Sequence, residues 1–402
     1  MPIATYILLK GEFDMKKMLK SVFSVVLSVV IIVCCCVYSR ASENLPVEIK
    51  AKAAVLMDVS TGKVLMKYNE NQRLYPASVT KIMPLLLVTE AIDEGRIALS
   101  DTVTVSATAA SKGGSQIWLK EGEQMTVDEL LKATAVYSAN DACTALGEFL
   151  AGSDEAFVKM LNDRASQLGM KNTHFENCTG LDDTTENHLT TALDIAIMSR
   201  ELLKHELITN YTTIWMDSLR NGQTELVNTN KLVRFYEGTT GLKTGTTSKA
   251  GCCVSASAMR EGTHLIAVVM GSENSTDRFE TAKAMLDWGF SNFTAVTPKI
   301  SRSSMNAVEV VGGKEDTVPL NVPNILPVII EKGQESQIKV SVNKKSSLEA
   351  PVKAGDKAGS IKIEIPGQDD IIYVLKAEKD VEKLTFYDCI LRIFNFIAQG
   401  KK

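Results

Sequence analysis

The hydrophobic pattern predicts a domain of strands and helices in the first three quarters of the chain. Short apolar runs typical of strands stand at both ends of this region, and apolar residues spaced by three and four lie between them. We expect strands at Ala53–Asp58, Lys63–Tyr68, Gly251–Met259 and His264–Gly271. We expect helices at Ile82–Ile92, Val127–Val136, Asp141–Leu150, Ser153–Leu168, Thr191–Leu203 and Thr276–Phe290. The order predicts an α/β (α+β) domain of residues 42–295, in which helices cover a mixed sheet.

After Pro298 the periodicity changes to strict alternation. Ile338–Val342, Ile361–Ile365 and Tyr373–Ala377 each alternate apolar and polar residues, and turns rich in Gly, Pro and Lys separate them. Alternation of this kind is typical of half-buried strands. Residues 296–380 are therefore expected to form a small all-β domain.

The last segment, residues 381–402, has the pattern of an amphipathic helix. Its apolar positions are Leu384, Tyr387, Ile390, Leu391, Phe394 and Ile397. A wide apolar face with aromatic rings is difficult to leave in water, so we expect this helix to lie on a membrane surface. The alternative is an ordinary helix docked on the preceding domain.

The N-terminal segment resembles a secretory signal peptide. Lys16, Lys17 and Lys20 precede an apolar run from residue 22 to residue 37, and small residues allow a cut after Ala41. The run is about 16 residues long, whereas a spanning helix usually needs about 20. We therefore expect residues 1–41 to be removed and the protein to be exported, either to the extracytoplasmic face of the membrane or free of it. A retained anchor and lipid attachment within Cys34–Cys36 are the alternatives, but no small-residue lipid-attachment motif precedes those cysteines.

Composition excludes several classes of protein. The 402 residues carry 44 basic and 48 acidic side chains, a net charge of −4, which argues against a nucleic-acid binder. The eight Cys form no C-x-x-C pair and there are four His, so a zinc finger is not indicated. Five Cys follow residue 41, at positions 143, 178, 252, 253 and 389. No disulfide framework is predicted, and the odd number requires at least one thiol that is free or paired between molecules.

The first candidate catalytic motif is Ser78-Val79-Thr80-Lys81, which follows Pro76 and opens an apolar helix. Residues three apart share a helix face, so the Ser78 hydroxyl and the Lys81 amine can meet. The hydroxyl becomes a nucleophile when a base takes its proton, and Lys81 can do so if burial lowers its pKa. Taken alone, this spacing is common, and a solvated surface pair is the alternative.

Two further motifs gain weight from their order. Ser138-Ala139-Asn140 lies between two expected helices, where Ser138 can relay a proton and Asn140 can hold a substrate amide; a helix cap is the alternative. Lys243-Thr244-Gly245-Thr246 leads to a strand, where Lys243 and the hydroxyls can bind a carboxylate. There Gly245 permits close approach of the substrate backbone, and the N–H of Thr246 can stabilise an oxyanion. A plain turn is the alternative reading of this third motif.

An S-x-x-K, an S-D-N and a K-T-G are the set found in penicillin-binding proteins and β-lactamases, and the three motifs of this chain stand in that order. The chain resembles the low-molecular-mass penicillin-binding proteins of the serine D-alanyl-D-alanine carboxypeptidase family, although its middle motif reads S-A-N instead of S-D-N. Supporting stretches are Tyr75–Lys81, Asn172–Phe175, Thr179–Asp182, Asn228–Leu232 and Gly241–Thr246. The resemblance covers nearly the whole chain and implies a β-lactamase/transpeptidase-like catalytic domain.

The resemblance also implies roles for individual residues. Ser78 is the expected nucleophile and Lys81 its base, while Ser138 and Asn140 relay the proton and hold the substrate amide. Lys243, Thr244, Gly245 and Thr246 are expected around the terminal carboxylate of D-alanine, with the oxyanion bound by the N–H groups of Ser78 and Thr246. His188 and the loop around Asp182 are expected at the rim of the cleft.

The implied partners are a peptidoglycan stem pentapeptide as substrate, β-lactams as inhibitors and the membrane surface, with no metal or cofactor. Three alternatives stay open. A class A β-lactamase needs a carboxylate for the deacylating water, for which Glu186 is a weak candidate, and would lack the β-rich domain. A D,D-endopeptidase would cut cross-links, and a binding module would carry an inactive site.

Overall fold

The computed structural model describes residues 45–301 and 305–398 of the chain. The predicted signal segment, residues 1–41, lies outside this part.

The α/β region is built on a five-stranded sheet in the order β2-β1-β9-β8-β7. Its strands are β1 (Ala53–Asp58), β2 (Val64–Tyr68), β7 (Thr239–Thr247), β8 (Gly251–Arg260) and β9 (Thr263–Ser272). Each neighbouring pair is antiparallel: tight turns join β1 to β2 and connect β7, β8 and β9 in succession, and β1 pairs with the distant β9 in the same sense. The expectation of a mixed sheet is wrong in this detail. β7 lies at one edge, which leaves one side of this strand unpaired in the sheet.

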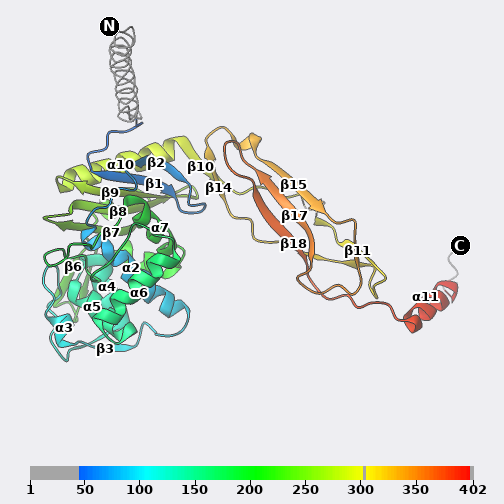
Figure 1. Cartoon of the computed structure of the whole chain (residues 1–402), viewed down its shortest axis with the longest axis horizontal. Helices are drawn as coiled ribbons and strands as arrows, with labels where there is room; N and C mark the ends of the chain where they lie inside the picture. The colour runs from blue at the N-terminus through cyan, green and yellow to red at the C-terminus, as the bar shows by residue number, and fades with distance from the viewer. Residues whose placement is uncertain (1–44, 302–304, 399–402) are drawn as a thin grey trace, which may run out of the picture. The chain divides into compact units, whose positions relative to one another are not determined.

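Helices cover both faces of this sheet, as predicted. Figure 1 shows α10 (Ser275–Asn292) on one face and the other helices of this region on the opposite face. α7 (Ala192–Leu202) contacts β1 and β9 there, and α2 (Ile82–Asp93) packs against α7 and against α5. The remaining helices are α3 (Ala107–Ala110), α4 (Val127–Lys132), α5 (Asn140–Ala151), α6 (Asp154–Gln167), α8 (Glu206–Thr212) and α9 (Leu232–Phe235). All six helices expected from the spacing are present, five with ends within about two residues of those predicted; the exception is Val127–Val136.

The differences from the predicted elements lie between α2 and β7. The expected helix Val127–Val136 stops at Lys132 and continues as a π-helical turn over Ala133–Tyr137. Two short hairpins that the pattern did not indicate are also present: β3 (Thr102–Thr104) with β4 (Gln124–Thr126), and β5 (Met216–Leu219) with β6 (Thr224–Val227). Strands of three or four residues are too short to show an alternation.

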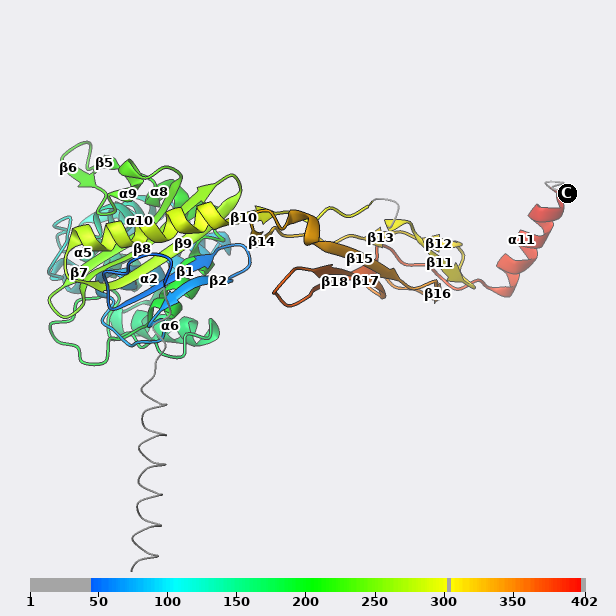
Figure 2. The same cartoon turned by 90° about the horizontal axis from the view of Figure 1, so that it is seen from above.

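The predicted β-rich region consists of three small sheets. They pair β10 with β14, then β12-β11-β16, then β13-β18-β17-β15. Their bounds are β10 (Phe293–Val296), β11 (Val308–Val311), β12 (Thr317–Val318), β13 (Leu320–Asn321), β14 (Val328–Glu331), β15 (Lys339–Lys344), β16 (Ser347–Glu349), β17 (Lys357–Glu364) and β18 (Ile371–Ala377). Figure 2 shows β15, β17 and β18 side by side. Their inward residues, such as Ile361, Ile363 and Leu375, form a hydrophobic core separate from that of the α/β region.

The C-terminal segment ends in helix α11 (Phe386–Ala398), which is shorter than the predicted amphipathic segment. Within residues 45–301 and 305–398, the structure contains no helix with the length and apolar character that crossing a bilayer requires.

Candidate active site

Ser78 stands on a tight turn between a proline and a buried helix. Ala77–Lys81 form a 3-10 turn that leads directly into α2, so Ser78 and Lys81 lie one turn apart on the same face. Ala77 has φ +49°, a left-handed conformation that is uncommon for a residue with a Cβ. Ser78 is partly exposed, whereas Ala77, Val79 and Thr80 around it are buried. The turn therefore presents one reactive hydroxyl from an otherwise buried segment.

Lys81 has the properties of a base for this hydroxyl. Its side chain is fully buried, and its Nζ lies 2.9 Å from Ser78 Oγ and 2.8 Å from the carbonyl oxygen of Thr179. Burial lowers the pKa of Lys81 to about 8, although the thiols of Cys143 and Cys178 and the Asp141 carboxylate oppose this shift. A substantial fraction of the amine is therefore neutral near physiological pH and able to take a proton.

The second motif lies at a break between two helices. The π-helical turn ends at Ser138, which has φ +68°, and α5 begins at Asn140. Asn140 donates from its side chain to Gly113 O (2.6 Å) and from its backbone to Ser115 O (2.7 Å). Within the described part of the chain, Ser138 Oγ and Asn140 Oδ1 are buried atoms that lack a hydrogen-bond partner. Buried polar atoms are normally paired, so these two atoms are available to hydrogen-bond a ligand.

The third motif lies on the edge strand β7, directly against Ser78. A Cβ placed on Gly245 would stand 2.6 Å from the backbone nitrogen of Ser78 and 2.9 Å from that of Val79. Gly245 therefore allows the close approach of the turn that carries Ser78, whereas the sequence suggested that it makes room for the substrate backbone. Thr244 donates its hydroxyl proton to Thr229 Oγ1 at 2.7 Å. The Asn228–Leu232 stretch, which supported the resemblance, therefore contacts the third motif.

Lys243 is buried beside Lys81. Its Nζ donates to the carbonyl oxygen of Thr244 (3.1 Å), and burial, followed by the charges of Lys81 and Arg278, lowers its pKa well below the usual value. Two neighbouring buried amines resist carrying full charge together. A carboxylate brought to Lys243 would favour its protonated form. Lys243 is therefore suited to binding an anion, and Lys81 to acting as a base.

Arg278, which the sequence analysis did not identify, supports β7 by hydrogen bonds from α10. Its Nη1 donates to the carbonyl oxygen of Gly245 (3.0 Å) and to Thr246 Oγ1 (3.0 Å). Thr246 itself is exposed, which leaves it accessible to a ligand. Arg278 lies in α10 without a motif of its own, so no local signal could identify it.

Asp141 was also missed, and it holds the loop that faces Asn140. Its buried carboxylate accepts the backbone N–H groups of Ile117 (3.1 Å) and Leu119 (3.0 Å). Asp141 follows the S-A-N motif directly in the sequence, and this position is the signal that could have identified it.

Glu186, the weak candidate for a β-lactamase base, does not have the required surroundings. The residue is exposed, and Tyr75 Oη donates to its main-chain carbonyl at 3.2 Å. Within the described residues, no hydrogen bond or ion pair fixes its carboxylate, so nothing holds it in place to activate a water.

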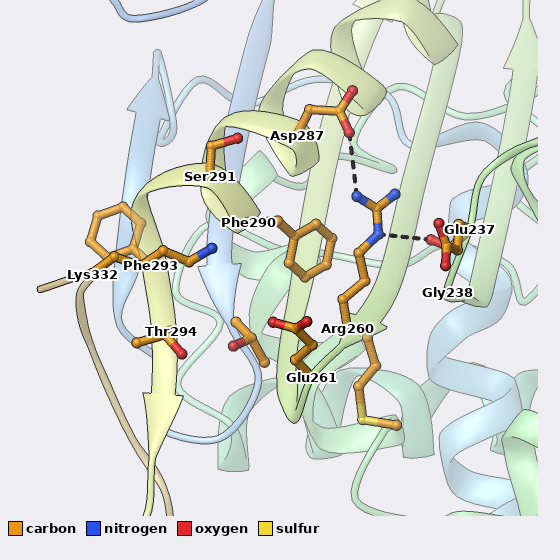
Figure 3. Close-up of a pocket in the computed structure, with 12 residues that line it drawn as sticks. Glu237, Gly238, Arg260, Glu261, Asp287, Phe290, Ser291, Phe293, Thr294 and Lys332 are labelled. Atoms are coloured by element: carbon orange, nitrogen blue, oxygen red, sulfur yellow. Dashed lines mark hydrogen bonds and ion pairs between the residues drawn. The ribbon is translucent and has the colours of Figure 1, made fainter. Parts of the chain in front are cut away.

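A separate pocket of about 820 Å³ contains none of the three motifs. It is lined by residues that include Arg260, Asp287, Phe290 and Lys332. Figure 3 shows Arg260 linked to Asp287 and to the backbone of Glu237. The guanidinium of this pocket is therefore already paired with protein groups. The motifs, and not this cavity, define the candidate active site.

Comparison with known proteins agrees with the geometry. The family described as D-alanyl-D-alanine carboxypeptidase matches residues 39–274, and the one described as penicillin-binding protein 5, C-terminal domain, matches residues 293–383. The D-alanyl-D-alanine carboxypeptidase DacF of Bacillus subtilis is 41% identical over 347 residues, which cover 85% of this chain and 89% of that protein.

Solved structures agree as well. Penicillin-binding protein 5 of Haemophilus influenzae superimposes with a TM-score of 0.71 at 31% identity, over 84% of this chain and 99% of that one. Penicillin-binding protein D2 of Listeria monocytogenes in its cefotaxime-bound form gives a TM-score of 0.56 at 29% identity, over 61% of this chain and 98% of that one.

Two family matches therefore cover both the catalytic region and the β-rich region, and a relative at 41% identity spans most of the chain. The chain belongs to the D-alanyl-D-alanine carboxypeptidase family, the low-molecular-mass penicillin-binding proteins.

Proposed function

We propose that Ser78 is the nucleophile of a serine D-alanyl-D-alanine carboxypeptidase and that Lys81 is its general base. Lys81 takes the hydroxyl proton as Ser78 Oγ attacks the carbonyl carbon between the two D-alanines of a stem pentapeptide. The C–N bond then breaks, the leaving amine takes a proton through Ser138, and free D-alanine departs. Water hydrolyses the ester of Ser78 and restores the enzyme.

The observation that carries this proposal is the 2.9 Å contact between Ser78 Oγ and the Nζ of a fully buried lysine with a pKa of about 8. A base with a pKa near the working pH is effective in proton transfer. Asn140 is proposed to hold the substrate amide, and Lys243, Thr244 and Thr246 its terminal carboxylate. The N–H groups of Ser78 and Thr246 are proposed to bind the oxyanion. These roles are supported by the two unpaired buried atoms of Ser138 and Asn140 and by the position of β7 against Ser78.

The test is release of D-alanine from a pentapeptide that ends in D-Ala-D-Ala. Lys81→Gln should lower the turnover number by at least about a thousandfold, because Ser78 loses its base. Lys159→Gln removes an exposed lysine paired with Asp163 and should leave turnover unchanged. Turnover by Lys81→Gln near the unmodified rate would refute the assignment.

β-Lactams are proposed as inhibitors that acylate Ser78. Support comes from the cefotaxime-bound relative and from the shared geometry of a strained amide and a D-Ala-D-Ala bond. The acyl-enzyme should persist, because ring opening leaves the amine leaving group tethered to the acyl group, whereas D-alanine departs from the substrate and admits water.

We also propose that the protein is exported, with residues 1–41 as a signal, 42–295 as the catalytic domain and 296–380 as the β-rich domain. The tail, residues 381–402, would hold the enzyme at the extracytoplasmic membrane surface. Support for the tail comes from exposed apolar side chains on α11, including Phe394 (66% exposed) and Ile397 (69%). Arg392, on the polar side, donates to Lys314 O (2.5 Å) and to the Asp316 carboxylate (2.9 Å), so that side is held by protein.

A further inference from the structure

His188 lies underneath the nucleophile turn instead of at the rim of the cleft. The side chain is 0% exposed, and its ring packs against Phe175 with 5.7 Å between ring centroids. Its Nε2 lies 2.9 Å from Thr80 Oγ1, inside the S-x-x-K motif.

The hydrogen bonds of His188 fix its tautomer. The backbone N–H of Glu176 donates to Nδ1 at 2.9 Å, so Nδ1 carries no proton. The neutral ring therefore has its proton on Nε2 and donates it to Thr80 Oγ1. The Thr80 hydroxyl in turn donates to the carbonyl oxygen of Ala77 at 2.8 Å. The proton donors point in one direction, from Glu176 through His188 and Thr80 to Ala77.

This chain of bonds ends on the residue before the nucleophile, which has an unfavourable backbone conformation. Ala77 has φ +49°, and such conformations persist where surrounding contacts impose them. Gly180 packs closely against the same carbonyl, since a Cβ on Gly180 would lie 1.8 Å from Ala77 O. The Ala77–Ser78 peptide is therefore held by a hydrogen bond from one side and by close packing from another.

We propose that His188 is a positioning residue for the acylation reaction, which acts through Thr80 and the Ala77 carbonyl to fix the orientation of Ser78. The proposal rests on the assignment of Ser78 as nucleophile. His188 touches neither the substrate nor the reacting atoms. Its contribution is to hold the Ser78 hydroxyl where Lys81 and the substrate carbonyl are both within reach.

The ring is neutral over the working range of the enzyme. Burial, and next the charge on His174, lowers the pKa of His188 to about 4, while the Asp182 carboxylate opposes the shift. Above that pH the donor chain stays in one arrangement. Loss of His188 should therefore reduce the rate of acylation without moving its pH dependence, which follows Lys81.

The test measures the second-order rate of acylation by a fluorescent penicillin, with folding checked by thermal unfolding. His188→Phe keeps a ring against Phe175 and removes both hydrogen bonds, and Thr80→Val removes the hydroxyl at nearly constant volume. Each should slow acylation by about ten- to a hundredfold, as expected for a small misplacement of a reacting group. His188→Gln can accept from Glu176 and donate to Thr80, so it should restore most of the rate.

The double variant decides between positioning and simple stabilisation. If His188 acts through Thr80, the double variant His188→Phe with Thr80→Val should be no slower than the slower single variant. His264→Phe is the matched control, because His264 Nε2 makes the same 2.9 Å contact with Thr240 Oγ1 and its pKa is also lowered to about 4 by burial. This control should acylate at the unmodified rate even if its melting temperature falls.

The outcomes separate this proposal from the assignment of the nucleophile. Labelling of Ser78→Ala would overturn the nucleophile itself. If Ser78→Ala is unlabelled but folded His188→Phe and Thr80→Val acylate at the unmodified rate, the positioning role alone is wrong. Rate losses that multiply in the double variant, or a shifted pH profile, would also contradict a route through Thr80.

Discussion

At the scale of single residues, the reaction depends on a lysine that folding makes less basic. Lys81 is surrounded by protein, and burial favours its neutral form because the charged form loses its hydration. The Lys81 shift also couples to stability: the folded chain releases this proton near pH 8, whereas the unfolded chain holds it until about 10.5. The unfolded state binds more protons in this window, so the contribution of Lys81 to stability rises with pH between these values.

The first prediction is the pH profile of acylation. The rate should rise by about tenfold per pH unit below pH 8 and level off above it, since only the neutral amine accepts the Ser78 proton. Stopped-flow measurement with a fluorescent penicillin gives this profile directly. A rate that does not change between pH 6 and pH 9 would mean that Lys81 does not limit acylation.

The second prediction concerns Gly245→Ala. The added methyl group would stand 2.6 Å from Ser78 N, a backbone atom in a packed turn that has little room to move. We expect acylation to fall by about a hundredfold, because the turn or the strand must shift. Circular dichroism and the melting temperature show whether β7 still forms. A folded Gly245→Ala enzyme with normal acylation would contradict the close approach of β7 to Ser78.

The motif residues were predictable from the sequence because their chemistry is local. Ser78 and Lys81 share a turn, and Ser138 and Asn140 are two residues apart, so each pair is visible in the sequence, although only the order of the three motifs singles them out. His188 and Arg278 could not be assigned in this way, since their partners lie about a hundred and about thirty residues away along the chain.

At the scale of elements, three pieces of backbone with unusual geometry meet at the site. The 3-10 turn before α2, the left-handed Ser138 before α5 and the edge strand β7 each present one motif. The spacing predicted α2 and β8 well, because apolar residues there follow one period. It could not predict the π-helical turn, since Ala133–Tyr137 continue the helical spacing, nor the left-handed Ser138, since that conformation usually indicates glycine.

The third prediction tests the support of the second motif. Asp141→Asn replaces an acceptor oxygen with an NH₂ group opposite the N–H groups of Ile117 and Leu119. An unsatisfied buried donor costs about 1–3 kcal/mol, so the free energy of unfolding should fall by that amount in urea titration. The Michaelis constant should rise as well, because this loop holds Asn140.

Asp163→Asn is the control for Asp141→Asn. Asp163 pairs with Lys159 on the surface, and its replacement should change the unfolding free energy by less than about 0.5 kcal/mol. Equal losses in the two variants would show that Asp141 has no special place in the fold.

At the scale of the whole molecule, the catalytic and β-rich regions have separate hydrophobic cores, and α11 exposes its apolar side. The change from helical to alternating periodicity after Pro298 was sufficient to predict two kinds of fold. The order of the strands was not predictable, because pairing such as that of β10 with β14 joins segments whose patterns carry no mark of their partner.

The fourth prediction concerns attachment to membranes. Phe394→Ser together with Ile397→Ser should abolish co-sedimentation with phospholipid vesicles, because two exposed apolar side chains of α11 are lost. Asn395→Ser, between them, should bind vesicles like the unmodified chain. Equal binding by all three proteins would exclude this face of α11 as the attachment surface.

The fifth prediction concerns the thiols of the chain without residues 1–41. Cys143, Cys178, Cys252 and Cys253 are buried and free, whereas Cys389 is exposed. A maleimide should label one thiol in the native protein and all five after denaturation without reductant. A lower total after denaturation would reveal a disulfide.

The most direct measurement of the central claim is the intact mass of the protein after reaction with penicillin. The unmodified chain should gain the mass of one penicillin, peptide mapping should place it on Ser78, and Ser78→Ala should gain nothing. An adduct of the same mass on Ser78→Ala, or one mapped to another residue of the unmodified chain, would contradict the account.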